Sequence, residues 1–243
     1  MPRGTTTTAG LFVTGTGTGV GKTYVAAMIC RALASEGRRV GVYKPVASGC
    51  RREGDRLISD DALKLWHAAG QPGNLETVCP QRFAAPLAPH LAARAEGRQV
   101  DARLLRTALD FWLDASEIVV VEGAGGLLSP VSDDEYVADL ACDFGWPLIV
   151  VAPNRLGVIH DTLATLVVAA TFRDGLDVAG VVLNQPPSAP LDASVASNYD
   201  ELCRRSVPPV MANVSANAAR FGPPVDWWSL ATFAACEATR RGE

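Results

Sequence analysis

Residues 15–23 read Gly-Thr-Gly-Thr-Gly-Val-Gly-Lys-Thr and lie between the apolar run 11–13 and the helix-forming sequence 24–28. Glycines let successive backbone N–H groups turn toward phosphate oxygens, and the N-terminus of the following helix adds partial positive charge. In such a loop the lysine, here Lys22, reaches the outer phosphates of a nucleotide, and the hydroxyl of Thr23 can ligate Mg²⁺. The stretch therefore predicts a phosphate-binding loop between a strand and a helix, and a reaction that uses ATP or GTP.

This loop is a variant of the common pattern. The usual first glycine stands five residues before Gly21, where this chain has Thr16, and Gly15 lies one place earlier. An ordinary Gly/Thr-rich turn is the alternative interpretation. The strand pattern before the loop and the helix pattern after it favour the phosphate loop.

The length and composition indicate a globular protein. With 243 residues, of which 48% are hydrophobic, the chain is long enough for one large α/β domain with a substantial core. We expect a flexible tail over residues 1–9 and a single domain over 10–243. The net charge is −4, the pI is near 5.4, and no run of basic residues exceeds a pair, which disfavours a nucleic-acid or membrane partner.

Cysteine usage and hydropathy predict the compartment. The six cysteines are dispersed without a C-x-x-C pair, and the three histidines lack metal-site spacing. This pattern is typical of reduced thiols in a cytosolic protein. The N-terminus shows no charged segment followed by a long apolar stretch, and no run of about 18 apolar residues occurs. We therefore expect a cytoplasmic protein that is neither secreted nor membrane-spanning.

Short apolar runs alternate with helical patterns along the chain. Strands are predicted at 11–14, 40–43, 118–121, 148–152 and 178–183, and helices at 22–35, 60–69, 101–114, 159–173, 191–205 and 226–240. Segment 184–190 is predicted to be a surface loop. Strands that are apolar at nearly every position and separated by helices imply a parallel sheet covered on both faces.

Polar residues follow several of these strands. Gly15, Lys44, Glu122 and Asn184 each come just after a strand, and ligands of such sheets bind at the carboxyl ends of the strands. We expect the four positions to converge on one rim. Lys44, followed by Pro45, is a candidate second cation for phosphate or substrate; the alternative is a solvated surface lysine.

Three further side chains are candidates for the same rim. Ser48 is a candidate hydroxyl donor. Glu122, which ends a buried strand and precedes Gly-Ala-Gly-Gly, suits the magnesium site of a phosphate-loop protein, although an ordinary turn is possible. Asp60 and Asp61 open a helix; we interpret Asp60 as the helix cap and Asp61 as the residue that would have to be aimed at the metal.

Five segments, in this order and spacing, resemble the dethiobiotin synthetase family over roughly residues 10–215. They are 15–23, 43–49 (Tyr-Lys-Pro-Val-Ala-Ser-Gly), 61–63 (Asp-Ala-Leu), 83–90 (Phe-Ala-Ala-Pro-Leu-Ala-Pro-His) and 121–126 (Val-Glu-Gly-Ala-Gly-Gly). The phosphate loop alone is shared by very many NTPases, so the whole set carries the resemblance. It implies a single phosphate-loop α/β domain that works as a homodimer. It also implies a reaction that closes the ureido ring of biotin's precursor from 7,8-diaminononanoate (7,8-diaminopelargonate), carbon dioxide and ATP with Mg²⁺.

The resemblance also implies roles for individual residues. Lys22 and Lys44 would be catalytic, and Thr23, Asp61 and Glu122 would hold Mg²⁺. ATP would be bound by Gly19, Val20, Gly21, Lys22, Thr23, Tyr24, Asp61, Glu122, Gly123, Ala124, Gly125, Asn184, Gln185, Val214 and Ser215, with Asn184 reading adenine. The diamine would be bound by Thr18, Lys44, Ser48, Gly157, His160 and Tyr199, with Tyr199 reaching the substrate of the partner subunit.

The implied chemistry needs no protein nucleophile. One amine adds carbon dioxide to give a carbamate, whose oxygen attacks the γ-phosphorus. The second amine then attacks the resulting mixed anhydride, closes the ring and expels phosphate. The two lysines and Mg²⁺ would offset charge on the transferring phosphoryl group.

Two departures from the family pattern are visible. Residues 155–161 correspond to a stretch that normally ends in Asn-His, so His160 and Asp161 replace both residues. We expect the helix that begins near Gly157 to present its amides to the substrate carboxylate, with His160 as an added donor and Asp161 pointing away. Alternatively, His160 only packs against a neighbouring helix. Ser215 stands where a proline usually flanks the adenine pocket, which predicts weaker adenine selectivity.

Two other functions compete with this one. A ParA- or MinD-like ATPase switch acts on DNA or membrane, but its loop begins with a lysine where this chain has Gly17, and no basic or amphipathic surface is evident. A cobyrinate-amidating enzyme would require a glutaminase domain, for which we find no room. The ligase is the preferred hypothesis.

Overall fold

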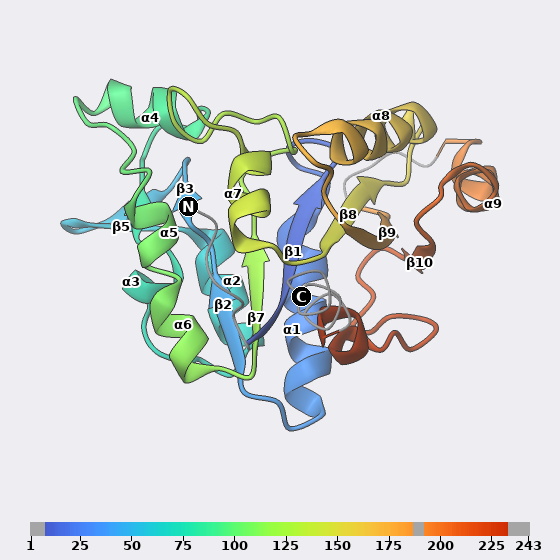
Figure 1. The fold of residues 1–243 in the computed structure, drawn as a ribbon, viewed down its shortest axis with the longest axis horizontal. Coiled ribbons are helices and arrows are strands. Elements are labelled where there is room, and N and C mark those ends of the chain that lie inside the picture. Colours follow the sequence, from blue (N-terminus) through green and yellow to red (C-terminus); the bar gives the residue numbers. More distant parts are fainter. Residues whose placement is uncertain (1–7, 187–191, 233–243) are drawn as a thin grey trace.

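The computed structural model describes residues 8–186 and 192–232 of the chain (Figure 1). A six-stranded sheet in the order β10-β9-β8-β1-β7-β2 forms its centre, and all of its neighbouring strands run parallel. The strands are β1 (Ala9–Gly15), β2 (Val40–Tyr43), β7 (Ile118–Glu122), β8 (Leu148–Pro153), β9 (Val178–Asn184) and β10 (Val210–Val214). The α/β class predicted from the sequence is confirmed, and the edge strand β10 is an addition to it.

Helices and short β segments connect these strands. The helices are α1 (Lys22–Ser35), α2 (Asp60–Ala68), α3 (Leu75–Val78), α4 (Pro89–Ala95), α5 (Leu104–Thr107), α6 (Asp110–Ala115), α7 (Val137–Phe144), α8 (Val158–Thr171) and α9 (Val195–Arg205). Two small sheets pair β3 (Val46–Ala47) with β6 (Gln81–Arg82), and β4 (Arg51–Glu53) with β5 (Arg56–Ile58).

The structure corrects several predicted helices. The single helix expected over 101–114 is two short helices, α5 and α6, and α3, α4 and α7 were not expected. Helix α9 begins at Val195 rather than at residue 191, which lies outside the described residues. Of the helix expected over 226–240, residues 227–232 are helical and 233–240 lie outside the described residues, as do 187–190 of the expected surface loop.

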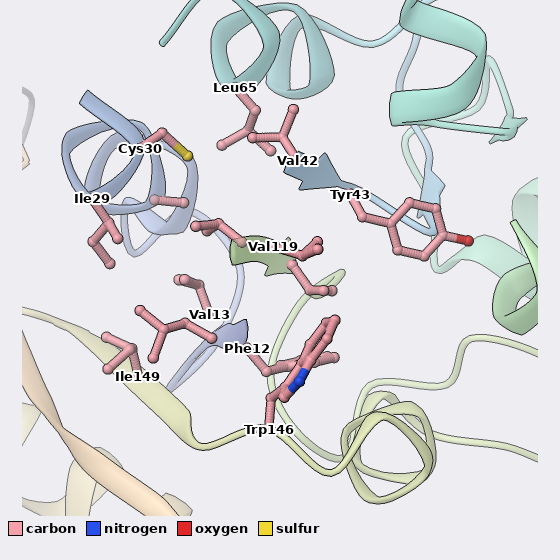
Figure 2. Close-up of a cluster of buried hydrophobic side chains, with 14 of the residues drawn as sticks. Phe12, Val13, Ile29, Cys30, Val42, Tyr43, Leu65, Val119, Trp146 and Ile149 are labelled. Atoms are coloured by element: carbon pink, nitrogen blue, oxygen red, sulfur yellow. The ribbon is translucent and has the colours of Figure 1, made fainter. Parts of the chain in front are cut away.

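The core lies on both faces of the central strands (Figure 2). Residues of β1 and β7 are buried at every position, as expected for strands covered on both sides. Ile29 and Cys30 of α1 pack on one face (Figure 2). On the other, Phe12 of β1 and Tyr43 of β2 each contact the ring of Phe144 at the end of α7. This double cover fixes the strands whose carboxyl ends carry the candidate site.

The N-terminal boundary falls slightly earlier than expected. Ala9, assigned to the tail by the sequence, is buried in β1 and paired with Ile118, while residues 1–7 lie outside the described range. Over the residues that are described, no helix has the length and apolar character needed to cross a membrane.

Candidate functional site

A cavity of about 650 Å³ lies at the carboxyl ends of β1, β2 and β7. The sequence-predicted residues that line it are Thr18, Gly19, Gly21, Lys22, Thr23, Tyr24, Lys44, Ser48, Asp61, Glu122, Ala124 and Gly125. Parallel strands expose their carboxyl ends at the same edge of the sheet, so residues far apart in the chain meet there. The convergence predicted for Lys44 and Glu122 is therefore observed.

The phosphate loop depends on glycine where helix α1 starts. Gly21 is the N-cap of α1, with a left-handed φ of 95°. A side chain at this position is disfavoured by the backbone angle, and its Cβ would also displace the amide group of Asn184. Lys22 Nζ donates to the carbonyl of Gly17 at 2.7 Å, which holds the ammonium over the loop. The free α1 N-terminus and this ammonium form an anion site.

Lys44 connects the second strand to two carboxylates. Its Nζ lies 2.9 Å from Asp61 Oδ2 and 2.6 Å from Glu122 Oε1. The side chains of Lys44 and Glu122 are 4% and 1% exposed, whereas that of Asp61 is 44% exposed. The lysine is therefore a fixed buried cation and not the solvated surface residue of the alternative interpretation.

Burial and charge shift the pKa values of this group. Burial lowers the pKa of Lys22 to about 8, and nearby Lys44 lowers it further while Glu122 opposes the shift. Burial raises the pKa of Glu122 above its ordinary value, although the Lys44 ammonium opposes this. For Lys44 itself, burial would lower the pKa, but the two carboxylates outweigh it and raise the pKa. Asp61 is desolvated as well, yet Lys44 holds its pKa below the ordinary value.

Oxygen atoms suited to a divalent cation are grouped beside the loop. Thr23 Oγ1 donates to Glu122 Oε1 at 2.9 Å, while Glu122 Oε2 is buried without a hydrogen-bond partner. Hydroxyl and carboxylate oxygens are ligands that Mg²⁺ prefers, and an unpartnered buried carboxylate oxygen fits a cation. Within the described ranges, no group of three or more His, Cys, Asp or Glu side chains is arranged to hold a metal by itself. Phosphate oxygens or water would therefore have to complete the coordination.

The start of α2 differs in one respect from the sequence interpretation. Ser59, not Asp60, is the N-cap, because its side chain accepts from the backbone N–H of Ala62. Asp60 is exposed in the first turn and pairs with Arg51 of β4 at 2.8 Å. This leaves Asp61 as the aspartate that faces the cavity, as predicted.

Asn184, which was predicted to read adenine, lies beside the loop but does not line this cavity. Asn184 Nδ2 donates to the carbonyl of Val20 at 3.0 Å, and its Oδ1 is buried without a hydrogen-bond partner. The backbone N–H of Gln185 donates to the carbonyl of Val214 at 2.8 Å. Tyr24 also reaches this side, where its hydroxyl donates to the carbonyl of Ala218. Ser215 is exposed, and Gly123 is buried and does not line the cavity.

A second cavity of about 460 Å³ adjoins the first through Thr18, Ser129 and Pro130, which line both. Its other walls come from the beginning of the phosphate loop, residues 126–128 and helix α8. Asp161, in the first turn of α8, lines this cavity. The prediction that its side chain points away from the bound substrate stays a prediction.

The remaining substrate candidates lie apart from both cavities. Gly157, with a φ of 95°, is the N-cap of α8, so the predicted helix start is confirmed. His160 is exposed and lines neither cavity. Tyr199 is half-buried on α9 and lines neither cavity. The roles proposed for these residues stay predictions.

Sequence reasoning missed several residues of the larger cavity. They are Val46, Ala47, Lys64, Pro86, Leu87, Ala88, Pro89, Ser129 and Pro130. Lys64 could have been found, because it lies three residues after Asp61 and residues at this spacing share a helix face. Residues 86–89 lie within segment 83–90, one of the five that resemble the family, but they are apolar and no binding role was predicted for them.

Comparisons with known proteins place this geometry in context. A family model described as an AAA domain matches residues 9–220. An ATP-dependent dethiobiotin synthetase BioD from Rhodopirellula baltica is 45% identical over 215 residues, which cover 84% of this chain and 82% of the relative. Proteins of the same name from Anaeromyxobacter dehalogenans (46% identical, covering 76% of this chain and 82% of the relative) and Aromatoleum aromaticum (36%, covering 84% and 88%) are similar over most of their lengths.

A solved structure with a different name and low sequence identity shares the fold. A ParA family ATPase from Chlorobium tepidum superposes with a TM-score of 0.50 at 13% sequence identity, covering 97% of this chain and 93% of that chain. At this identity the likeness concerns the fold alone.

Proposed function

The chain belongs to the dethiobiotin synthetase family, and from that membership we propose the reaction and the residue roles that follow. It is an ATP-dependent ligase of biotin biosynthesis. The similarity to a ParA family ATPase is one of fold, and we set the switch hypothesis aside. The substrates are 7,8-diaminononanoate, carbon dioxide and ATP, and the product is dethiobiotin.

Three bond changes make up the proposed reaction. A neutral amine of the diamine attacks carbon dioxide and releases a proton, which gives a carbamate. A carbamate oxygen attacks the γ-phosphorus of ATP and displaces ADP. The second amine attacks the carbonyl carbon of the mixed carbamic-phosphoric anhydride, loses a proton and expels inorganic phosphate, which leaves the cyclic urea.

Two lysines stabilise the phosphoryl transfer in this proposal. Lys22 binds the outer phosphates from the loop side, and Lys44 supplies a cation at the end of β2. Because Asp61 and Glu122 hold the Lys44 ammonium before ATP binds, little reorganisation is needed when negative charge develops. This buried, doubly paired lysine beside the phosphate loop is the observation that supports the proposal most directly.

The hydroxyl and carboxylate oxygens beside the phosphate loop are suitable ligands for Mg²⁺. Thr23, Asp61 and Glu122 would hold the ion together with ATP phosphates, and the unpartnered Glu122 Oε2 is available to it. When bound, Mg²⁺ neutralises charge on the transferring phosphate. The protein orients these oxygens through β7 and through the starts of α1 and α2.

The diamine is proposed to lie between the two cavities. Thr18 lines both, and Ser48 and Lys44 line the larger one, so the amines would bind there while the alkyl chain extends past Ser129 and Pro130. Leu127, Leu128 and Val168 give the smaller cavity an apolar wall for that chain.

Beyond the smaller cavity, the amides at the start of α8 and His160 would bind the substrate carboxylate. A homodimer would bring Tyr199 of one subunit to the substrate of the other. On the nucleotide side, Asn184 would read adenine through Oδ1, which has no protein partner. The cysteines of the described segments are free thiols, which supports a cytoplasmic location as part of the proposal.

A product assay tests this function. The protein is incubated with diaminononanoate, ATP, Mg²⁺ and bicarbonate, and dethiobiotin is identified by mass spectrometry together with ADP and phosphate. We expect equal amounts of the three products, and none of the ring-closed product when the diamine or bicarbonate is omitted. ATP hydrolysis that responds to DNA or lipid vesicles, but not to the diamine, would overturn the proposal.

A further inference from the structure

The chain contains three lysines, Lys22, Lys44 and Lys64, and its other 19 basic residues are arginines. All three lysines line the 650 Å³ cavity, and no arginine does. Two of them have roles in the proposed function. In a chain that uses arginine almost everywhere else, a third lysine in the same cavity calls for an explanation of its own.

Lys64 differs from the other two lysines in its contacts. Lys22 donates to the Gly17 carbonyl and Lys44 is held by two carboxylates. Among the described residues, no hydrogen bond or ion pair engages the Lys64 ammonium, and the residue is exposed at the cavity wall. Asp60, one turn earlier on the helix, is already paired with Arg51. Lys64 is therefore a cation available to a ligand.

The position of Lys64 indicates which ligand it meets. It lies three residues after Asp61 on α2, so the two side chains share one face of the helix. Asp61 stands beside Thr23 and Glu122, where the outer phosphates and their metal ion belong in the proposed function. The two carboxylates of this cavity are taken up by Lys44, which leaves the cavity with excess positive charge for a polyanion.

We propose that Lys64 is a third phosphate-binding lysine, which contacts the β- and γ-phosphates of MgATP from α2. This inference rests on the proposed function for its nucleotide, but not for ring closure. A lysine suits the position because its ammonium is a compact point charge that fits beside a hydrated metal ion, whereas a guanidinium is planar and wider. The ordinary alternative is a solvated lysine on a helix surface.

Nucleotide binding by matched variants tests the proposal. The variants are Lys64→Ala, Lys64→Arg and, as a control, Arg52→Ala, which removes one exposed positive charge from the neighbouring strand β4. Affinity for the non-hydrolysable analogue AMPPNP with Mg²⁺ is measured by calorimetry at several salt concentrations. We expect Lys64→Ala to raise Kd by about three- to tenfold and to weaken its salt dependence, with Lys64→Arg intermediate. The control should change Kd by less than about twofold.

Kinetics with the complete substrates add a second readout. The KM for ATP should rise in Lys64→Ala by a similar factor while the KM for the diamine stays unchanged, and melting curves should show intact folding. Unchanged Kd and KM for nucleotide in Lys64→Ala, an equal loss in the Arg52 control, or a change confined to the diamine KM would each overturn the proposal.

The two proposals fail separately. If the wild-type protein forms dethiobiotin but nucleotide affinity is indifferent to Lys64, only the role of Lys64 is wrong. If nucleotide affinity depends on Lys64 but no dethiobiotin forms, the assigned reaction is wrong and the phosphate contact stands.

Discussion

Lys44 and Thr23 both donate to the same oxygen of Glu122, Oε1, at 2.6 and 2.9 Å. The second oxygen, Oε2, is buried without a partner. One carboxylate thus positions the cation of the second strand and the hydroxyl of the phosphate loop, and still has an oxygen available for a metal ion.

Replacing Lys44 with alanine should abolish most ring closure. Loss of a preorganised cation at the transferring phosphate should cost about 3 kcal/mol, or about two orders of magnitude in kcat. The sequence alone predicts that this variant keeps its fold. The structure predicts that the variant is also less stable, because the Glu122 carboxylate would remain buried without its partner. Product formation and thermal melting should be measured together. A variant with near-wild-type turnover would contradict the assignment of Lys44.

Metal dependence should separate Asp61 from Asp60. We expect Asp61→Asn and Glu122→Gln to raise the Mg²⁺ concentration for half-maximal activity by about tenfold or more, because each removes an anionic oxygen from the site. Asp60→Asn is the matched control, since Asp60 pairs with Arg51 outside the cavity. Titrations of activity with Mg²⁺ at saturating ATP provide the measurement. A strong effect of Asp60→Asn with a weak effect of Asp61→Asn would reverse the assignment.

ATP binding should take up a proton when the pH is above about 8. Burial lowers the pKa of Lys22 to about 8 in the free protein, so the amine is increasingly neutral above that pH. A bound triphosphate favours the ammonium and raises this pKa again, so affinity should fall as the pH rises through about 8.

Calorimetry in buffers of different ionisation enthalpy measures this uptake, with EDTA present to exclude metal-linked protons. Uptake should be larger near pH 9 than near pH 7 and should vanish in Lys22→Arg, whose guanidinium does not titrate in this range. Equal uptake in wild type and Lys22→Arg would assign the proton to another group.

His160 should contribute to binding the diamine through its polar side chain. We expect His160→Asn to keep the wild-type KM for the diamine and His160→Leu to raise it several-fold, because a donor near the start of α8 assists the amides in binding a carboxylate. Steady-state kinetics at saturating ATP provide the comparison. Equal KM values for the leucine variant and wild type would leave carboxylate binding to the backbone amides.

Asp161 should oppose the same substrate. Asp161 lines the smaller cavity, and in the proposed function the carboxylate of the substrate binds near this cavity. We expect Asp161→Asn to lower the KM for the diamine by about two- to fivefold, and to do so more strongly at low salt. A higher KM in this variant would show that Asp161 assists binding, for example through an amine of the substrate.

Local patterns with strict geometric requirements could be predicted from the sequence. The phosphate loop needs its glycines and lysine at fixed spacing, and the rule that ligands bind at strand ends brought Lys44 and Glu122 together without structural information. The central strands are apolar at nearly every position, so their burial was evident. These parts of the fold and site were confirmed.

Other parts depend on tertiary contacts that no local pattern specifies. Strand β10 is short and contains Asn213, and it is a strand because it pairs with β9 at the edge of the sheet. Ser59 rather than Asp60 caps α2. Serine and aspartate are both good capping residues, so the sequence does not decide which of the two neighbours is the cap. Asp161 of α8 lines the smaller cavity together with residues of the phosphate loop, and its sequence position does not show this.

The distribution of lysine also gives the protein an unusual chemical property. Apart from the α-amino group, every primary amine of the chain lies in the wall of one cavity, since arginine supplies all other basic side chains. Reductive methylation with ¹³C-formaldehyde would therefore introduce three lysine NMR probes that all report on the same site. Reagents that acylate amines at random on most proteins would act here as site-directed labels, and protection of these amines by a nucleotide would measure occupancy directly.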